Sequence, residues 1–130
     1  MDNFQLSIRI TKGFASMNKA IQDKSFRFAV RIVNLCRYLQ TEQKEYILTK
    51  QLLRCGTSIG ANVAESQQAQ SRPDFISKLN IALKEAYETN YWLRLLYETN
   101  YLNEDGFQSI VTDCRELEKL LISIIKASKQ

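Results

Sequence analysis

Apolar side chains recur at steps of three and four residues along most of the chain, as they do on one face of an α-helix. The first such stretch covers about 24–39, with Phe28, Ile32, Leu35 and Leu39 on one side. Further apolar residues widen its apolar arc to roughly 220° on a helical wheel. A helix in an isolated bundle needs a narrower stripe, so the pattern predicts that another subunit also covers this helix.

Three further helical stretches follow, separated by short breaks. We expect helices over about 45–68, about 72–101, and from the turn at 102–105 to about 126. Long helices joined by short connections pack as antiparallel neighbours. The pattern therefore predicts an all-α, up-and-down antiparallel four-helix bundle over 24–130, preceded by an unassigned N-terminal extension over 1–23.

Two serines stand where helices should begin. Ser25 lies at the start of the first stretch, where its hydroxyl can accept an unpaired backbone N–H of the first turn. Ser71 precedes Asp74 by three residues, a spacing similar to a capping box, and Pro73 is tolerated in a first helical turn. These residues predict helix N-termini near 25 and 72.

Small residues line one side of the second stretch. Gly56, Gly60 and Ala64 recur one helical turn apart. Because a glycine inside a helix costs about 1 kcal/mol relative to alanine, this row indicates the close approach of a neighbouring helix backbone.

The same stretch carries a polar row: Arg54, Ser58, Asn62 and Glu65 share one side of the helix. One interpretation is a recognition surface for nucleic acid or protein. The other is a structural hydrogen-bond network at a helix or subunit contact, with Arg54 paired to a carboxylate. We favour the network, because polar residues at interfaces can fix register and oligomeric state.

Composition argues against catalysis. The 130 residues include no histidine, so the commonest general base and metal ligand are missing. Cys36, Cys55 and Cys114 lie far apart among apolar residues, as reduced, buried thiols do. Acidic pairs at 85/88 and 113/116 have a spacing that can hold Mg²⁺, but they should point outward without converging. We expect no enzyme activity, cofactor or metal.

Charge is concentrated near the N-terminus. The whole chain has a formal net charge of +4, and residues 1–41 alone hold seven basic and two acidic side chains. The first stretch carries the candidate nucleic-acid-binding residues, which are Lys24, Arg27, Arg31, Arg37 and Tyr38. The basic side chains could neutralise phosphates and the tyrosine could stack on a base. The alternative is a solvated face paired with acidic side chains of another helix.

Aromatic residues gather in the outer half of the third stretch, at Tyr87, Tyr91, Trp92 and Tyr97. Such residues anchor cores and interfaces, so we expect core or oligomer contacts, with an exposed aromatic patch as the alternative. No stretch reads as a membrane span or secretory signal, which favours a cytoplasmic protein without a membrane partner.

Two segments closely resemble a known family: QLLRCGTSIGANVAES from Gln51 and SRPDFISKLNIALKEAYETNYWLRLL from Ser71. The opening SFRFAVRIVNLCRYL, from Ser25, fits the first helix of that family. It is the four-helix bundle family first met in intervening sequences of bacterial 23S ribosomal RNA genes. The residues that carry the resemblance are Arg54, Ser58, Ile59, Asn62, Ala64, Glu65, Ser71, Asp74 and Phe75.

The resemblance implies an up-and-down bundle, a ring-shaped homopentamer as in known relatives, and a link to RNA. A related branch resembles the accessory protein of diversity-generating retroelements, which binds a reverse transcriptase and nucleic acid. Residues 1–23 are not covered by the resemblance. Met17 stands where relatives often begin, so translation starting at Met17 is a hypothesis that the intact mass of the natively expressed protein would test.

Three classes of function compete at this point. The first is a non-enzymatic oligomeric scaffold that binds RNA or DNA through its basic first helix. The second is a protein-interaction module that recruits a partner enzyme and binds no nucleic acid itself. An enzyme is the least favoured. Nucleic-acid binding should weaken steeply with salt, whereas apolar recruitment of a protein should not.

Overall fold

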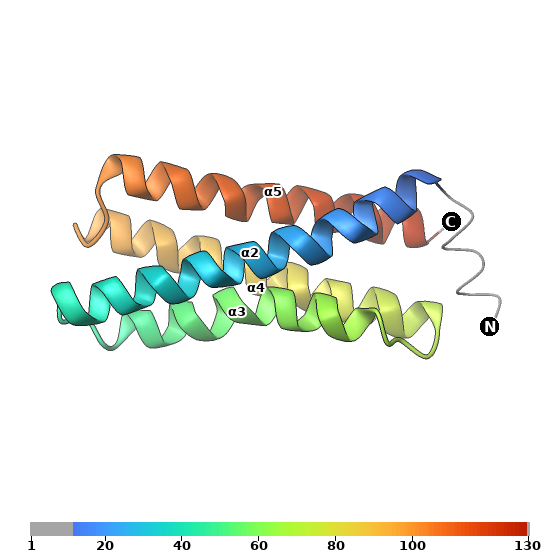
Figure 1. Cartoon of the computed structure of the whole chain (residues 1–130), viewed down its shortest axis with the longest axis horizontal. Helices are drawn as coiled ribbons and strands as arrows, with labels where there is room; N and C mark the ends of the chain where they lie inside the picture. The colour runs from blue at the N-terminus through green and yellow to red at the C-terminus, as the bar shows by residue number, and fades with distance from the viewer. Residues whose placement is uncertain (1–11, 130) are drawn as a thin grey trace.

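The structure, a computed structural model, describes residues 12–129, and over this range it is all-α with no strand. Its four helices are α2 (Lys12–Glu42), α3 (Leu48–Ser66), α4 (Arg72–Glu98) and α5 (Glu104–Ser128). Successive helices run in opposite directions along one long axis (Figure 1). The arrangement is the up-and-down bundle that the short connections predict.

The core lies along the bundle axis and takes residues from every helix. Its largest fully buried members include Phe28 on α2, Ile59 on α3, Leu79 on α4 and Leu121 on α5. Each sits on the apolar stripe of its helix, because burial of one stripe per helix is what holds such a bundle together.

The first helix starts earlier than expected. We predicted a start near Lys24 with Ser25 as the cap, but α2 begins at Lys12. Phe14 and Ile21 are buried, continuing the core stripe at the seven-residue spacing that leads to Phe28. Ser25 lies inside the helix, is buried, and donates its hydroxyl to the carbonyl of residue 22 at 3.3 Å. Residues 1–11 of the expected extension lie outside the described residues.

The second helix starts at Leu48, three residues later than expected, because an acidic side chain organises the preceding turn. Glu45 is buried, and its carboxylate accepts backbone N–H bonds from Ile47, Leu48 and Thr49 at 3.1, 2.8 and 2.8 Å. Lys44 has a φ of 55°, which reverses the chain direction just before this carboxylate. The turn thus replaces the helical turn that the apolar pattern predicted.

The other two helices have side-chain caps. The hydroxyl of Ser71 accepts from the backbone N–H of Asp74 at 3.2 Å, as the capping-box spacing predicts. The Asn103 side chain accepts from Gly106 N at 2.7 Å at the start of α5. Helix α4 ends at Glu98, three residues before the predicted end, because Asn100 adopts a left-handed φ of 70°.

Candidate interaction surfaces

The two glycines of α3 lie against α2 of the same chain. A Cβ added to Gly60 would lie 3.2 Å from the carbonyl oxygen of Ser25, so the two helix backbones approach closely there. A Cβ added to Gly56 would lie 2.8 Å from Cγ2 of Ile32, whose side chain is fully buried. Ala64, the third small residue of the row, is exposed.

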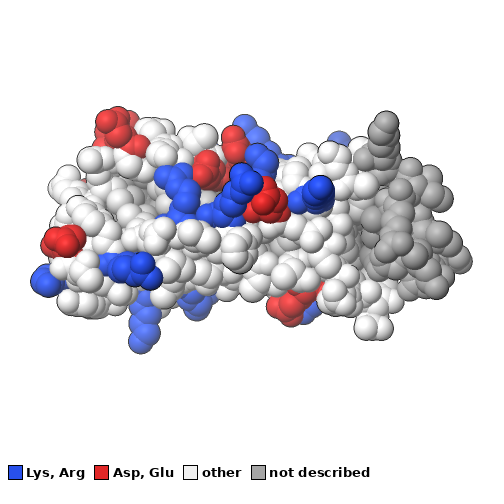
Figure 2. Space-filling view, viewed as in Figure 1, with Lys and Arg blue, Asp and Glu red and all other residues white. Residues whose placement is uncertain are grey.

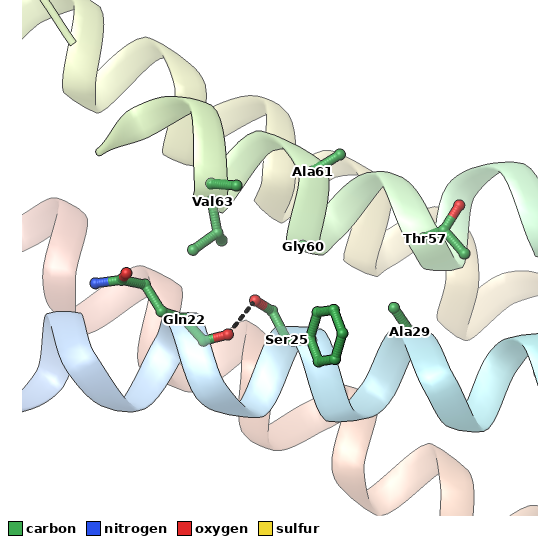
Figure 3. Close-up of a pocket in the computed structure, with 9 residues that line it drawn as sticks. Gln22, Ser25, Ala29, Thr57, Gly60, Ala61 and Val63 are labelled. Atoms are coloured by element: carbon green, nitrogen blue, oxygen red, sulfur yellow. Dashed lines mark hydrogen bonds between the residues drawn. The ribbon is translucent and has the colours of Figure 1, made fainter. Parts of the chain in front are cut away.

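An apolar groove opens over this contact. It has a volume of about 430 Å³ and lies between α2 and α3. Its lining residues are Gln22, Ser25, Phe26, Ala29, Thr57, Gly60, Ala61, Val63 and Ala64, and none of them is charged. Figure 3 shows Gly60 facing Ser25 across the groove, with Ala29 and Thr57 from opposite helices further along it. The small residues that let the helices approach also leave this hollow at the surface.

Three large apolar side chains of α2 are exposed, and one of them, Phe26, lines the groove. The exposed fraction is 70 % for Phe26, 45 % for Val30 and 36 % for Val33. They belong to the part of the wide apolar arc that the single bundle does not bury. We call this surface, made by Phe26, Ala29, Val30, Val33 and the α3 wall of the groove, the α2–α3 face.

We call the candidate nucleic-acid-binding residues of α2, which are Lys24, Arg27, Arg31, Arg37 and Tyr38, the basic stripe. Two of them meet acidic residues at the seam between α2 and α5. Arg31 Nη1 is 2.6 Å from an Asp113 carboxylate oxygen, and Lys24 Nζ is 3.7 Å from Glu116. Figure 2 shows basic and acidic side chains intermingled along this seam. Two of the four basic residues of the stripe, Lys24 and Arg31, are therefore paired with acidic residues of α5.

The rest of the stripe has weaker contacts. Arg27 pairs with Asp23, one turn earlier on α2, at 3.2 Å, and its side chain is 77 % exposed. The hydroxyl of Tyr38 accepts from the side-chain amide of Gln43 at 3.3 Å. Within residues 12–129 the Arg37 side chain has no ion pair and is exposed. The stripe is thus brought together on one helix, but not as a uniformly positive surface.

The polar row of α3 joins α3 to α4. Arg54 forms ion pairs with Glu85, at 3.4 Å, and with Glu88, whose carboxylate also accepts from the indole N–H of Trp92 at 3.0 Å. Glu65, at the other end of the row, pairs with Lys78 at 3.3 Å. These contacts join α3 to α4 within one chain.

The two residues in the middle of the polar row, Ser58 and Asn62, form hydrogen bonds to the backbone of α3 itself. The Ser58 hydroxyl donates to the Arg54 carbonyl at 2.6 Å, and the Asn62 amide donates to the Ser58 carbonyl at 2.9 Å. Neither contact reaches another helix.

The thiols and carboxylates offer little reactive chemistry. Cys36, Cys55 and Cys114 are buried and free. Burial raises the pKa of Cys36 to about 12 and that of Cys55 to about 11, and it also raises the pKa of Cys114. Such thiols stay protonated and poorly nucleophilic. Among residues 12–129 no group of three or more acidic or cysteine side chains could hold a metal ion.

The aromatic residues of α4 divide into two sets. Tyr97 stacks on Phe107 of α5 with ring centroids 4.4 Å apart, and Trp92 is half-buried. Tyr87 and Tyr91 are instead 49 % and 54 % exposed. Sequence reasoning treated these aromatics as one group, because a wide aromatic arc does not reveal which side of the helix faces solvent. It also did not group the two exposed tyrosines with the basic residues beside them.

No helix within the described range is long and apolar enough to cross a membrane.

A comparison with curated proteins gives no match. A crystal structure of a protein of unknown function from the S23 ribosomal protein family of Bacteroides thetaiotaomicron is 60 % identical to this chain. The similarity covers 85 % of this chain and 98 % of that one, with a TM-score of 0.84. The model of the 23S rRNA-intervening sequence protein family matches residues 17–123, and the chain belongs to that family.

Proposed function

We propose that this protein is a non-enzymatic scaffold that assembles with copies of itself through the α2–α3 face. The observation that supports this most directly is Phe26, which is 70 % exposed beside an uncharged groove. An exposed phenylalanine next to two exposed valines costs solvation free energy that burial in an interface recovers.

The shape of the face suits a helical partner surface. The small side chains of Ala61, Ala64 and Gly60 leave a hollow of about 430 Å³, into which a larger side chain of a neighbouring copy can pack. Aromatic anchors that fill such pockets provide much of the energy of protein interfaces. No charged residue lines the groove, so burying the groove in an interface leaves no unpaired charge.

The ring-shaped pentamer implied by the resemblance is one assembly of this kind. In a closed ring each copy presents one face to a different surface of the next copy. The α2–α3 face would then be one of two surfaces that make each contact. The stoichiometry of five is part of the proposal and follows from the resemblance alone.

Nucleic-acid binding through the basic stripe of α2 stays a prediction and is not part of this proposal. The ion pairs of Lys24 with Glu116 and of Arg31 with Asp113 reduce the charge that the stripe offers to phosphates. Recruitment of a different protein by the same groove is the alternative function, and the test below separates it from self-assembly.

Light scattering coupled to size exclusion tests the proposal. The wild-type chain should have a mass of several times 15.1 kDa. Phe26→Ser combined with Val30→Ser should lower that mass while the helical circular dichroism is kept. Ile47→Ser is the matched control, because Ile47 is 78 % exposed and precedes α3 at the far end of the bundle. A monomeric wild type would contradict self-assembly and leave the groove to a helix of another protein.

A further inference from the structure

Two basic and two aromatic residues form a row on the outer side of α4. Lys84, Tyr87, Tyr91 and Arg94 follow one another at steps of three, four and three residues, so they share one side of the helix. All four are exposed. At a rise of 1.5 Å per residue the row spans about 15 Å, with both tyrosines between the two cations. We call these four residues the α4 row.

The cations of the α4 row differ from Lys24, Arg27 and Arg31 of α2, and resemble Arg37, in having no carboxylate partner within residues 12–129. Within residues 12–129, neither Lys84 nor Arg94 takes part in an ion pair or a side-chain hydrogen bond, whereas Lys24, Arg27 and Arg31 each have a carboxylate partner. The charges of Lys84 and Arg94 are therefore available to a ligand.

Three acidic groups near the α4 row, Glu85, Glu88 and Glu118, have partners outside the row. The Glu85 and Glu88 carboxylates pair with Arg54 on the α3 side of α4. On the α5 side, Glu118 accepts from the Asn90 amide at 3.3 Å, and exposed Arg115 precedes it by one turn. Glu98, one turn after Arg94, marks the end of the row.

The Tyr91 ring is supported from within the helix. Tyr91 packs edge-on against Trp92, with ring centroids 5.1 Å apart. The Trp92 indole is in turn held by its hydrogen bond to Glu88. These contacts position the Tyr91 ring beside a fixed indole while leaving half of the tyrosine exposed.

We propose that the α4 row binds single-stranded nucleic acid, with Tyr87 and Tyr91 stacking on bases and Lys84 and Arg94 neutralising phosphates. Aromatic rings stack on the exposed faces of unpaired bases, which a duplex hides, and cations alongside follow the backbone. Full charges at both ends of the row also suit this ligand better than an apolar protein surface, since interface cores are depleted of charge.

The inference does not depend on self-assembly, because the α4 row and the α2–α3 face are different surfaces. Assembly would add to it by repeating the row. Several weak sites on one particle then bind one strand through their effective concentration.

Fluorescence anisotropy of the full-length chain with labelled single-stranded RNA, single-stranded DNA and a duplex of the same sequence tests the proposal. Both single strands should bind more tightly than the duplex, and their relative affinity distinguishes RNA from DNA as the preferred ligand. Tyr87→Ala with Tyr91→Ala should weaken binding by roughly tenfold or more. The corresponding pair of Phe variants should restore most of the affinity, because a phenyl ring still stacks.

The salt dependence tests the two cations. The slope of log K against log salt is negative, and Lys84→Gln with Arg94→Gln should reduce its magnitude by about 1.4. This is the change expected for the loss of two phosphate contacts on a single strand. Lys50→Gln with Lys119→Gln, which removes the same charge from α3 and α5, should change the slope less. Tyr46→Ala, at a 57 % exposed tyrosine outside the row, should leave affinity unchanged.

Four results would overturn the inference. The first two are no binding by the wild type at low salt and equal binding of duplex and single strand. The third is a loss of binding in Arg27→Ala with Arg31→Ala but not in the variants of the α4 row. The fourth is a fall in the mass of the assembly in the tyrosine variants. The last would make the α4 row a protein interface.

Discussion

Arg31 of α2 and Asp113 of α5 form an ion pair, with 2.6 Å between Nη1 and the carboxylate oxygen. The same guanidinium donates from Nη2 to the Ser109 hydroxyl at 2.8 Å and from Nη1 to the Ser109 carbonyl at 3.3 Å. One side chain thus links two helices through three acceptors. Its role in the single chain is to join α2 to α5.

We expect Arg31→Ala to lower the free energy of unfolding by about 1 kcal/mol or less. Both side chains of the pair are about two-fifths exposed, and solvent screens such pairs strongly. Urea unfolding measures the effect. Arg27→Ala is the control and should cost less, because its pair is local to α2 and more exposed. A larger loss in Arg27→Ala would contradict this role for Arg31.

The contact of Gly60 with Ser25 predicts that a side chain at position 60 destabilises the protein. In Gly60→Leu the added atoms meet the backbone of α2, and we expect a loss of about 1–3 kcal/mol and a changed mass in solution. Gly13→Ala should be neutral or stabilising, because nothing lies within 4 Å of its added Cβ and alanine favours the helix. Thermal melts of both variants test this. An unchanged melting temperature and mass for Gly60→Leu would contradict it.

Glu45 gives the bundle an acid-sensitive turn. Burial would raise the pKa of its carboxyl, but the N–H bonds from Leu48, Thr49 and Ile47 outweigh burial, and the pKa lies below its ordinary value. The group therefore stabilises the fold above the unfolded pKa, about 4.3, and this contribution is lost as pH falls through the folded pKa.

Glu45→Gln should therefore cost about 0.5–2 kcal/mol at pH 7, in the range of a lost helix cap. The difference from wild type should shrink as pH falls below about 4. Urea unfolding of both proteins at pH 7 and at acid pH measures it. A difference that grows toward acid pH would mean that the carboxylate does not cap α3.

The raised pKa values of the buried thiols predict slow modification of the native protein. At pH 8, Cys36 and Cys55 are almost entirely protonated, with pKa values of about 12 and 11. A thiol-reactive dye should label neither of them, nor Cys114, in the folded chain, and should label all three in urea. Rapid labelling of the native protein at any of the three would show that the site opens without global unfolding.

The helical period of the apolar residues predicted the bundle, because each of the four helices has to bury one apolar stripe in a shared core. The start of α2 was predicted wrongly because Ser25 was taken as a helix cap, although Phe14, Met17 and Ile21 carry the helical period of Phe28 further toward the N-terminus. Glu45 was predicted to lie in the second helix. Its capping contacts depend on the turn at Lys44, and the pattern of apolar residues gives no sign of that turn.

The surfaces were harder to predict than the fold. The sequence identified the basic residues of the first helix, but the pairing of Lys24 and Arg31 with α5 depends on which helices are neighbours across the bundle. The exposed part of the apolar arc, in contrast, followed from its width. The wheel indicated that one bundle could not bury the whole arc, and the structure shows that Phe26 and Val30 are among the residues left exposed.

The mass of the wild-type chain in solution, measured by sedimentation equilibrium over a range of concentrations, tests self-assembly most directly. We predict one dominant species at a multiple of 15.1 kDa, with five copies as the expected number. A single species at 15.1 kDa up to high micromolar concentration would contradict the proposal that the chain assembles with itself through its α2–α3 face.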